Sequence, residues 1–161
     1  MKSRKWLAPA WASLLLALVV TPVFASMPTH PTLKVTTLDG QPWNLSAQRG
    51  HWVIVNFWAT WCVPCIKEMP DISAFVSKHA NVRAIELAYD DSPAADIRAF
   101  LKKHPVSYPV AQVTLDKSPK DFDEPQGLPT TYLIAPDGTV AKRFIGPIDA
   151  SVLGHAIPAG K

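Results

Sequence analysis

The sequence predicts an α/β domain with a mixed β-sheet and helices on both of its faces. Residues 52–58 are nearly continuous in apolar, β-branched and aromatic side chains, the pattern of a strand covered on both sides. A helical pattern runs from Cys62 to about His79, and residues 82–88 then alternate like a second strand. Along the whole chain these signals give the order β-α-β-α-β-β-α, which is typical of an α/β domain.

The other elements follow from turn signals and periodicity. Residues 33–38 and 43–45 are β-prone and flank the turn signal Asp39-Gly40, so we expect an N-terminal β-hairpin. The later segments are predicted as a helix at 94–103, a β-prone stretch at 108–113, a loop or short helical turn at 118–126, strands at 130–134 and 139–145, and a last helix at 149–157 with Asp149 as its N-cap.

The first 25 residues are predicted to be a signal peptide. Three basic residues precede an uncharged apolar run over residues 6–20, and Val23-Phe24-Ala25 offers a cleavage site with small residues. We expect cleavage after Ala25 and a periplasmic location. The alternative is an uncleaved inner-membrane anchor, for which the apolar run falls short of the ~20 residues that span a bilayer comfortably. Residues 26–32 then form a flexible lead-in to one domain over residues 33–161.

The charge balance argues against two classes of partner. The chain has 16 Lys and Arg against 13 Asp and Glu, and three of the basic residues belong to the predicted signal. The remaining domain is therefore close to neutral. Nucleic acids and anionic membrane surfaces are bound by clustered Lys and Arg, so we expect neither as a partner.

Cys62 and Cys65 are the only cysteines in the chain. A disulfide between them would close a very small loop and constrain the unfolded chain little, so the spacing favours a redox-active pair over a structural disulfide. At the start of a helix, the dipole and free N–H groups stabilise a thiolate, lowering its pKa from ~8.5 toward ~3.5–7.5. Cys62 is therefore predicted to be the exposed attacking thiol and Cys65 the protected resolving thiol. Pro64 donates no N–H toward Cys62, so it tunes the redox potential.

A Cys-x-x-Cys pair is also half of a metal site, which leaves a second function open. Two thiolates can bind Cu(I), so a Cu(I)-binding, metallochaperone-like protein is the alternative from another class. The five histidines are scattered singly, and none has ligand spacing to the cysteines. We therefore expect neither a metal nor another cofactor.

Residues 56–65, followed by Glu68-Met69-Pro70, resemble the active-site segment of the TlpA/ResA-like branch of the thioredoxin superfamily. The resemblance extends from about Leu33 to Ile157 and includes a second motif over residues 127–134. It implies a thioredoxin-like fold and an exported thiol-disulfide oxidoreductase. Such proteins are often reductants, and some serve cytochrome c maturation.

The resemblance also implies partners. These are disulfide-containing client proteins and a thiol electron donor in the membrane or the periplasm. A thiol oxidase or isomerase is the alternative within redox chemistry. Those enzymes often carry an inserted helical region or a dimerisation domain, for which this chain has no room.

The same resemblance implies a wall for the active site. The proline that matches Pro129 is cis in thioredoxin-like folds and lies against the cysteine pair, which leaves the backbone at Leu128 free to pair with a client strand. An ordinary trans proline that opens a strand is the alternative. Trp61 is expected on the rim that faces the client, and Trp58 in the core.

Three acids are candidates for the proton acceptor of Cys65. Thioredoxin carries a buried Asp six positions before the first cysteine, where this chain has Asn56, which cannot take a proton. Glu68 is one candidate because the family pattern shares it. ResA-like proteins place a functional acid after the next strand, which implicates Asp90 or Asp91. The alternative makes Glu68 a solvated helix residue and the two aspartates a loop and N-cap pair.

Overall fold

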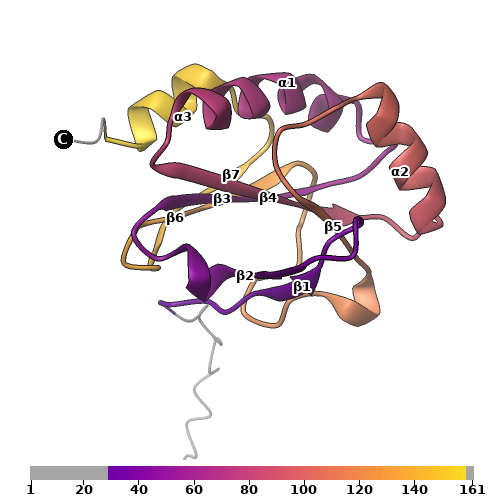
Figure 1. Ribbon diagram of the computed structural model, residues 1–161, viewed down its shortest axis with the longest axis horizontal. Coiled ribbons are helices and arrows are strands. Elements are labelled where there is room, and N and C mark those ends of the chain that lie inside the picture. Colours follow the sequence, from indigo (N-terminus) through magenta and orange to yellow (C-terminus); the bar gives the residue numbers. More distant parts are fainter. Residues whose placement is uncertain (1–28, 159–161) are drawn as a thin grey trace, which may run out of the picture.

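The computed structural model describes residues 29–158 (Figure 1), so the predicted signal peptide and its cleavage site lie outside the described residues. The strands are β1 (Lys34–Thr36), β2 (Pro42–Asn44), β3 (Trp52–Trp58), β4 (Val82–Tyr89), β5 (Val110–Val113), β6 (Thr130–Ile134) and β7 (Val140–Ile145). The α-helices are α1 (Val63–Lys78), α2 (Ala94–Lys103) and α3 (Ala150–Ala156), and η1 (Leu45–Gln48) and η2 (Leu115–Lys117) are short 3-10 helices.

Five strands form the central sheet in the order β5-β4-β3-β6-β7. β3, β4 and β5 are parallel, whereas β6 and β7 are antiparallel to their neighbours, so the sheet is mixed as predicted. The predicted element order has one strand fewer than the structure. The additional strand is β5, which forms at the sheet edge from the β-prone stretch at 108–113. β3 lies in the middle of this sheet, where its apolar side chains are covered on both faces.

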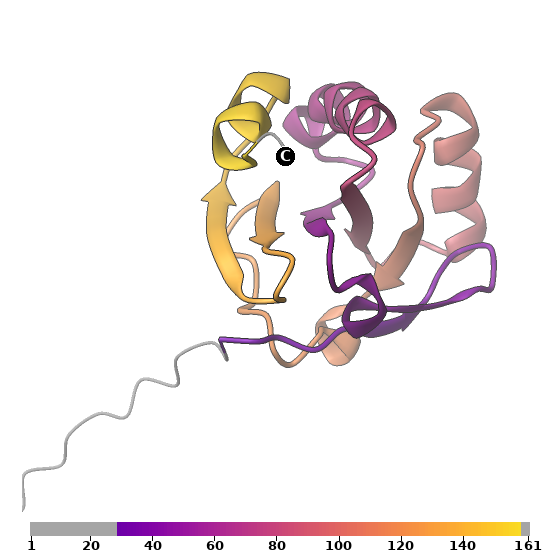
Figure 2. The same cartoon turned by 60° about the vertical axis from the view of Figure 1, so that its left-hand side comes forward.

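The three α-helices pack on one face of the sheet, so the prediction of helices on both faces is wrong. α1 and α3 lie together on this face (Figure 2), packed on Ile54 of β3 and Leu133 of β6. Ile97 of α2 joins a cluster with Trp58 of β3, which shares the orientation of Ile54. The reason is topological: β3-α1-β4 and β4-α2-β5 advance across the sheet in the same direction, and right-handed crossovers then place both helices on the same side.

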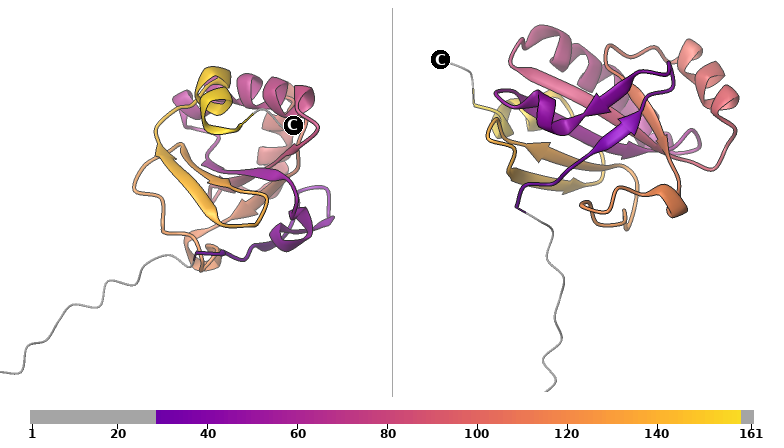
Figure 3. Two further views of the ribbon diagram at one scale, coloured as in Figure 1. Left: turned by 90° about the vertical axis from the view of Figure 1, so that its left-hand side faces the viewer. Right: turned by 60° about the horizontal axis from the view of Figure 1, so that its bottom comes forward.

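The opposite face is covered by the N-terminal hairpin and the segment after β5. β1 and β2 pair antiparallel around the turn at Gly40, as predicted, and the hairpin crosses this face of the sheet (Figure 3). Leu38 N–H donates to the carbonyl of Val110 at 2.7 Å, which fixes the hairpin to the edge strand. Phe122 packs between ring neighbours Phe57 and Tyr132. This cover buries the second face of the sheet without an α-helix.

Side chains of β3 alternate between the two faces of the sheet, and this alternation sets the face on which the polar residue Asn56 lies. Val53, Val55 and Phe57 face the hairpin, whereas Ile54, Asn56 and Trp58 face the helices. Asn56 is therefore buried directly beneath α1. Asp149 caps α3 as predicted, accepting a hydrogen bond from Val152 N–H at 2.8 Å. No helix in the described part of the chain is both long and apolar enough to cross a membrane.

Candidate active site

The two cysteines lie where β3 turns into α1. Cys62 is the N-cap of α1, and Pro64 occupies the first helical turn as predicted. Cys62 and Cys65 are joined by a disulfide, and Cys65 N–H donates to Cys62 Sγ at 3.3 Å. The sulfur atom of Cys62 thus receives one of the free N–H groups at the start of the helix, which is the contact that stabilises a thiolate there.

Both cysteines are buried. In this disulfide state Cys62 is only 4% exposed and Cys65 is 0% exposed, so the exposure of Cys62 as a free thiol stays a prediction. The exposed surface belongs instead to its neighbours Trp61 (69%) and Val63 (60%). Trp61 therefore lies on the rim as expected, whereas Trp58 is fully buried in the core.

The peptide bond between Leu128 and Pro129 is cis, as the resemblance implied. Leu128, the residue before the cis bond, packs against the hydrophobic cluster that contains both cysteines. The Pro129 carbonyl accepts a hydrogen bond from Gly146 N–H at 2.9 Å. Among residues 29–158, the backbone N–H and carbonyl of Leu128 have no backbone partner.

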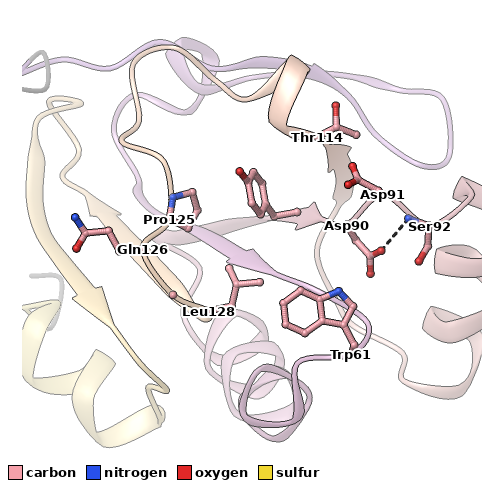
Figure 4. Close-up of a pocket in the computed structure, with 10 residues that line it drawn as sticks. Trp61, Asp90, Asp91, Ser92, Thr114, Pro125, Gln126 and Leu128 are labelled. Carbon is pink, nitrogen blue, oxygen red and sulfur yellow. Dashed lines mark hydrogen bonds between the residues drawn. The ribbon is translucent and has the colours of Figure 1, made fainter.

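A groove of about 460 Å³ opens beside Trp61, the residue before Cys62 (Figure 4). Trp61 and Leu128 lie along one side of it, and Asp90 and Asp91 lie toward the other (Figure 4). The remaining lining residues come from the end of β4 and the loop after it, the N-cap of η2 and the segment before Pro129: Tyr89, Ser92, Thr114, Pro125, Gln126 and Gly127. The groove therefore joins the two sequence motifs of the site.

Asp90 is buried and fastens the active-site turn. Its Oδ2 accepts hydrogen bonds from the N–H and hydroxyl of Thr60 at 2.9 and 2.6 Å, and its Oδ1 accepts one from Ser92 N–H at 2.9 Å. Burial raises the pKa of Asp90, but the bonds from Ser92 and Thr60 outweigh it and hold the pKa below its ordinary value. An acid held ionised in this way is a poor proton acceptor. Its contacts make it a positioning residue for the turn before Cys62.

Asp91 is exposed and lines the groove. The N-cap of α2 is Pro93, without a side-chain hydrogen bond. Neither aspartate therefore caps α2, and that part of the alternative interpretation is wrong.

Glu68 is buried at 3% exposure, so its interpretation as a solvated helix residue is also wrong. Asn56 Nδ2 donates to Glu68 Oε1 at 2.8 Å, and Ile148 N–H donates to Oε2 at 2.8 Å. Burial raises the pKa of Glu68 to about 7, against the lowering effect of the bonds from Ile148 and Asn56. Glu68 lies three residues beyond Cys65 on the inner face of α1, one turn deeper in the protein.

A second buried acid, Glu86, was not predicted from the sequence as a site residue. It is 1% exposed, and it pairs in register with Asn56 across β3 and β4. Tyr108 donates its hydroxyl hydrogen to Glu86 Oε1 at 2.6 Å. Burial raises the pKa of Glu86 to about 8, and the nearby Glu68 adds to the rise. The alternation of residues 82–88 was the available signal, because it puts Glu86 on the same face as its inward-facing alanine neighbours.

The family of the chain follows from comparison with known proteins. The model of the AhpC/TSA family matches residues 28–143. The chain belongs to the AhpC/TSA family. The thiol-disulfide oxidoreductase ResA of Bacillus cereus (strain ZK / E33L) is 37% identical over 120 residues, covering 72% of this chain and 67% of the relative. ResA of Bacillus subtilis (strain 168) is 34% identical over 125 residues, covering 76% and 69%. This AhpC/TSA family member is a thiol-disulfide oxidoreductase, as the sequence motifs predicted.

Solved structures confirm the thioredoxin-like fold. A thiol:disulfide interchange protein DsbE from Chlorobium tepidum, described as putative, superposes with a TM-score of 0.70 at 24% identity, covering 81% of this chain and 96% of that one. StoA from Bacillus subtilis superposes with a TM-score of 0.66 at 24% identity, covering 80% and 98%. The fold of this family member is thus a mixed five-stranded sheet with an N-terminal hairpin added.

The hydrogen bonds of Asp90 predict a pH-dependent stability. Asp90→Asn should lower the free energy of unfolding at pH 7 by about 1.5–3 kcal/mol, because an amide cannot accept all three bonds. The folded-state pKa lies below the ordinary 3.8, so this stabilisation is present above pH 3.8 and is lost as the pH falls through the folded-state pKa. Urea unfolding at pH 7 and at pH 3 measures both effects.

The matched control is Asp91→Asn on the exposed neighbour, which should change the free energy of unfolding by less than about 0.5 kcal/mol. A loss for Asp90→Asn that is equal at both pH values, or no larger than that of the control, would contradict the role assigned to Asp90.

Proposed function

We propose that this protein is exported to the periplasm and reduces disulfide bonds in client proteins through a dithiol-disulfide cycle of Cys62 and Cys65. The observation that carries the proposal is the disulfide at the start of α1, in a cluster against which Leu128, the residue before a cis proline, also packs. Export is supported by the amino-terminal composition, which has a basic start, an apolar run and a small-residue site.

In the first step, reduced Cys62 attacks a sulfur atom of the client disulfide. One client sulfur leaves as a thiolate, and the other stays bound to Cys62 as a mixed disulfide. Cys62 is suited to attack because it caps the helix, where the N–H groups and the dipole stabilise its thiolate. Cys65 has no exposed surface and cannot meet a client first.

Exposed apolar side chains around the disulfide support docking of a client. Trp61 and Val63 flank Cys62 and are 69% and 60% exposed. Ile145, at the end of β7, is 60% exposed, and its neighbour Gly146 is bonded to Pro129. The free N–H and carbonyl of Leu128 can pair with an extended client segment, which would bring its cysteine to Cys62.

In the second step, Cys65 resolves the mixed disulfide. Its thiol must lose a proton, and we assign Glu68 as the acceptor. Glu68 is buried one turn below Cys65, and a pKa of about 7 leaves it able to take up a proton near neutral pH. The Cys65 thiolate then attacks Cys62 Sγ, the second client thiolate leaves, and the Cys62–Cys65 disulfide forms. Two electrons pass to the client in each cycle.

The reductive direction is supported by the relatives named ResA and by the compact architecture. Between β3 and α3 the described chain has no inserted helical region of the kind expected for an oxidase or isomerase. In an oxidising compartment the cysteine pair must be reduced again after each cycle, so a thiol electron donor in the membrane or the periplasm completes the system. Apocytochrome c, whose cysteines must be reduced for haem attachment, is one client class that fits.

Trapping of the mixed disulfide tests the division of roles between the cysteines. Cys65→Ser should hold clients on Cys62, because no thiol remains to release them. The measurement is the recovery of client proteins that are released from the variant by dithiothreitol, followed by their identification, with apocytochrome c as one candidate. Cys62→Ser should trap far less, and the double variant nothing. Equal trapping by Cys62→Ser would reverse the assigned order.

The redox potential tests the direction of electron flow. Residues 26–161 should equilibrate with a dithiothreitol couple near the ~−270 mV of thioredoxin. Titration of the Cys62–Cys65 disulfide against buffers of defined potential gives the value. A potential near the ~−120 mV of a strong oxidant would show that the protein forms disulfides rather than reduces them.

A further inference from the structure

Two buried oxygen atoms in the centre of the protein have no hydrogen-bond partner. They are Asn56 Oδ1 and Glu86 Oε2. Both residues are 1% exposed, so water does not reach their side chains from the surface. An unpartnered buried polar atom costs about 1–3 kcal/mol, so two of them on neighbouring residues need an explanation.

The two atoms belong to residues that are neighbours in register on adjacent strands. Asn56 on β3 is in register with Glu86 on β4 and with Thr131 on β6, which lies on its other side. Asn56 Nδ2 donates to Thr131 Oγ1 at 2.9 Å, toward β6. The oxygen of the same amide is therefore directed away from β6, toward β4 and Glu86. Adjacent strands lie only about 4.8 Å apart, so the two side chains are neighbours.

A carboxylate oxygen and an amide oxygen that face each other repel, because both are hydrogen-bond acceptors. A proton on the carboxylate oxygen turns that repulsion into a hydrogen bond. A neutral carboxylic acid has one O–H donor and keeps its other oxygen as an acceptor. Glu86 Oε1 already accepts from the Tyr108 hydroxyl at 2.6 Å. A proton on Oε2 is the arrangement that gives both unpartnered oxygens a partner.

We propose that Glu86 is a neutral carboxylic acid in the folded protein, that its Oε2 hydroxyl donates to Asn56 Oδ1, and that it thereby fixes the amide that holds Glu68. Glu86 is then a positioning residue. The chain of contacts runs from Tyr108 through Glu86 and Asn56 to Glu68. The mechanistic importance of this chain rests on the proposed role of Glu68.

The groups that face Glu86 are consistent with a retained proton. The titratable ones are Tyr108, from the segment before β5, and Glu68, from α1. Asn56 from β3 is uncharged, and no cation is among the groups that influence Glu86. Burial raises the pKa of Glu86 most, and the charge of Glu68 raises it further, while the Tyr108 bond opposes the rise.

The bond also decides which way the amide of Asn56 points. If the amide turned over, its oxygen would face Glu68 Oε1 and its nitrogen would face Glu86. The donation from Glu86 excludes that orientation, so Nδ2 stays available to Glu68. Loss of the donor should weaken the Asn56 bond to Glu68 and so raise the pKa of Glu68, because that bond lowers it.

The direct test is a ¹³C NMR titration of the glutamate carboxyl carbons in the full chain. The Glu68 and Glu86 signals are assigned by their loss in Glu68→Gln and Glu86→Gln. The Glu86 signal should remain that of a neutral acid at pH 7, and the matched variant Glu124→Gln, at a surface residue, should leave that signal unchanged. A Glu86 signal that is already ionised at pH 7 would overturn the proposal.

Two variants of Glu86 test the positioning role in the same titration. Glu86→Gln keeps a donor for Asn56 Oδ1 and an acceptor for Tyr108, so the midpoint of Glu68 should stay within roughly 0.3 of its wild-type value. Glu86→Leu removes both, so the Glu68 midpoint should rise by roughly half a unit or more. Equal midpoints in the two variants would overturn the positioning role. These NMR signals do not depend on activity, so they test the positioning role of Glu86 even if Glu68 is not the proton acceptor. The kinetics of Glu68→Gln test the proton-acceptor role separately.

The pH dependence of stability is a second readout that needs only Glu86→Gln to fold. The unfolded chain releases the Glu86 proton near pH 4.5, and the folded protein releases it near pH 8. Between these values the folded state binds more protons, so the free energy of unfolding falls as the pH rises. Urea unfolding should show a shallower fall in Glu86→Gln than in the wild type or in Glu124→Gln. An unchanged slope would contradict a retained proton.

Discussion

The buried carboxyl group of Glu68 is the feature on which the organisation of this active site depends. It ties three parts of the chain together, because α1 carries it, Asn56 of β3 donates to one oxygen, and Ile148 before α3 donates to the other. A buried acid is costly unless it is hydrogen-bonded or neutral, so the fold must supply these donors. The same contacts that hold α1 on the sheet therefore place an acid with a raised pKa beneath the cysteine pair.

The fold creates this site by bringing distant segments to one end of β3. The strand ends in the turn that presents Cys62, and the acid after β4 fastens that turn through Thr60. β6, which pairs with β3 on the other side, begins directly after the cis proline. The disulfide is thus enclosed by the start of one helix and two loops, and each is fixed by its own strand.

Local patterns were sufficient to predict most of the elements. β3 and α2 have the predicted bounds, and the hairpin turn, the helix after Cys62 and the cap at Asp149 were read correctly from short-range signals. The prediction of helices on both faces was wrong, because the face that each helix takes depends on the spatial order of the strands, which periodicity does not reveal. The burial of Glu68 and of the disulfide-bonded Cys62 could not be predicted for a related reason: tertiary contacts cover them. Glu86 was missed because its contact with the site follows from its register with Asn56. A strand pattern alone does not specify which strand lies beside it.

The pH dependence of the resolving step tests whether Glu68 takes the proton of Cys65. A mixed disulfide between Cys62 and a model thiol is prepared, and the rate at which Cys65 releases that thiol is followed in the wild type, Glu68→Gln and the control Glu124→Gln. The rate should show an inflection near the pKa of Glu68, about 7, in the wild type and the control. In Glu68→Gln this inflection should be lost, and the rate should be about 10²–10⁴-fold lower. Identical profiles in all three proteins would show that Glu68 is not the proton acceptor.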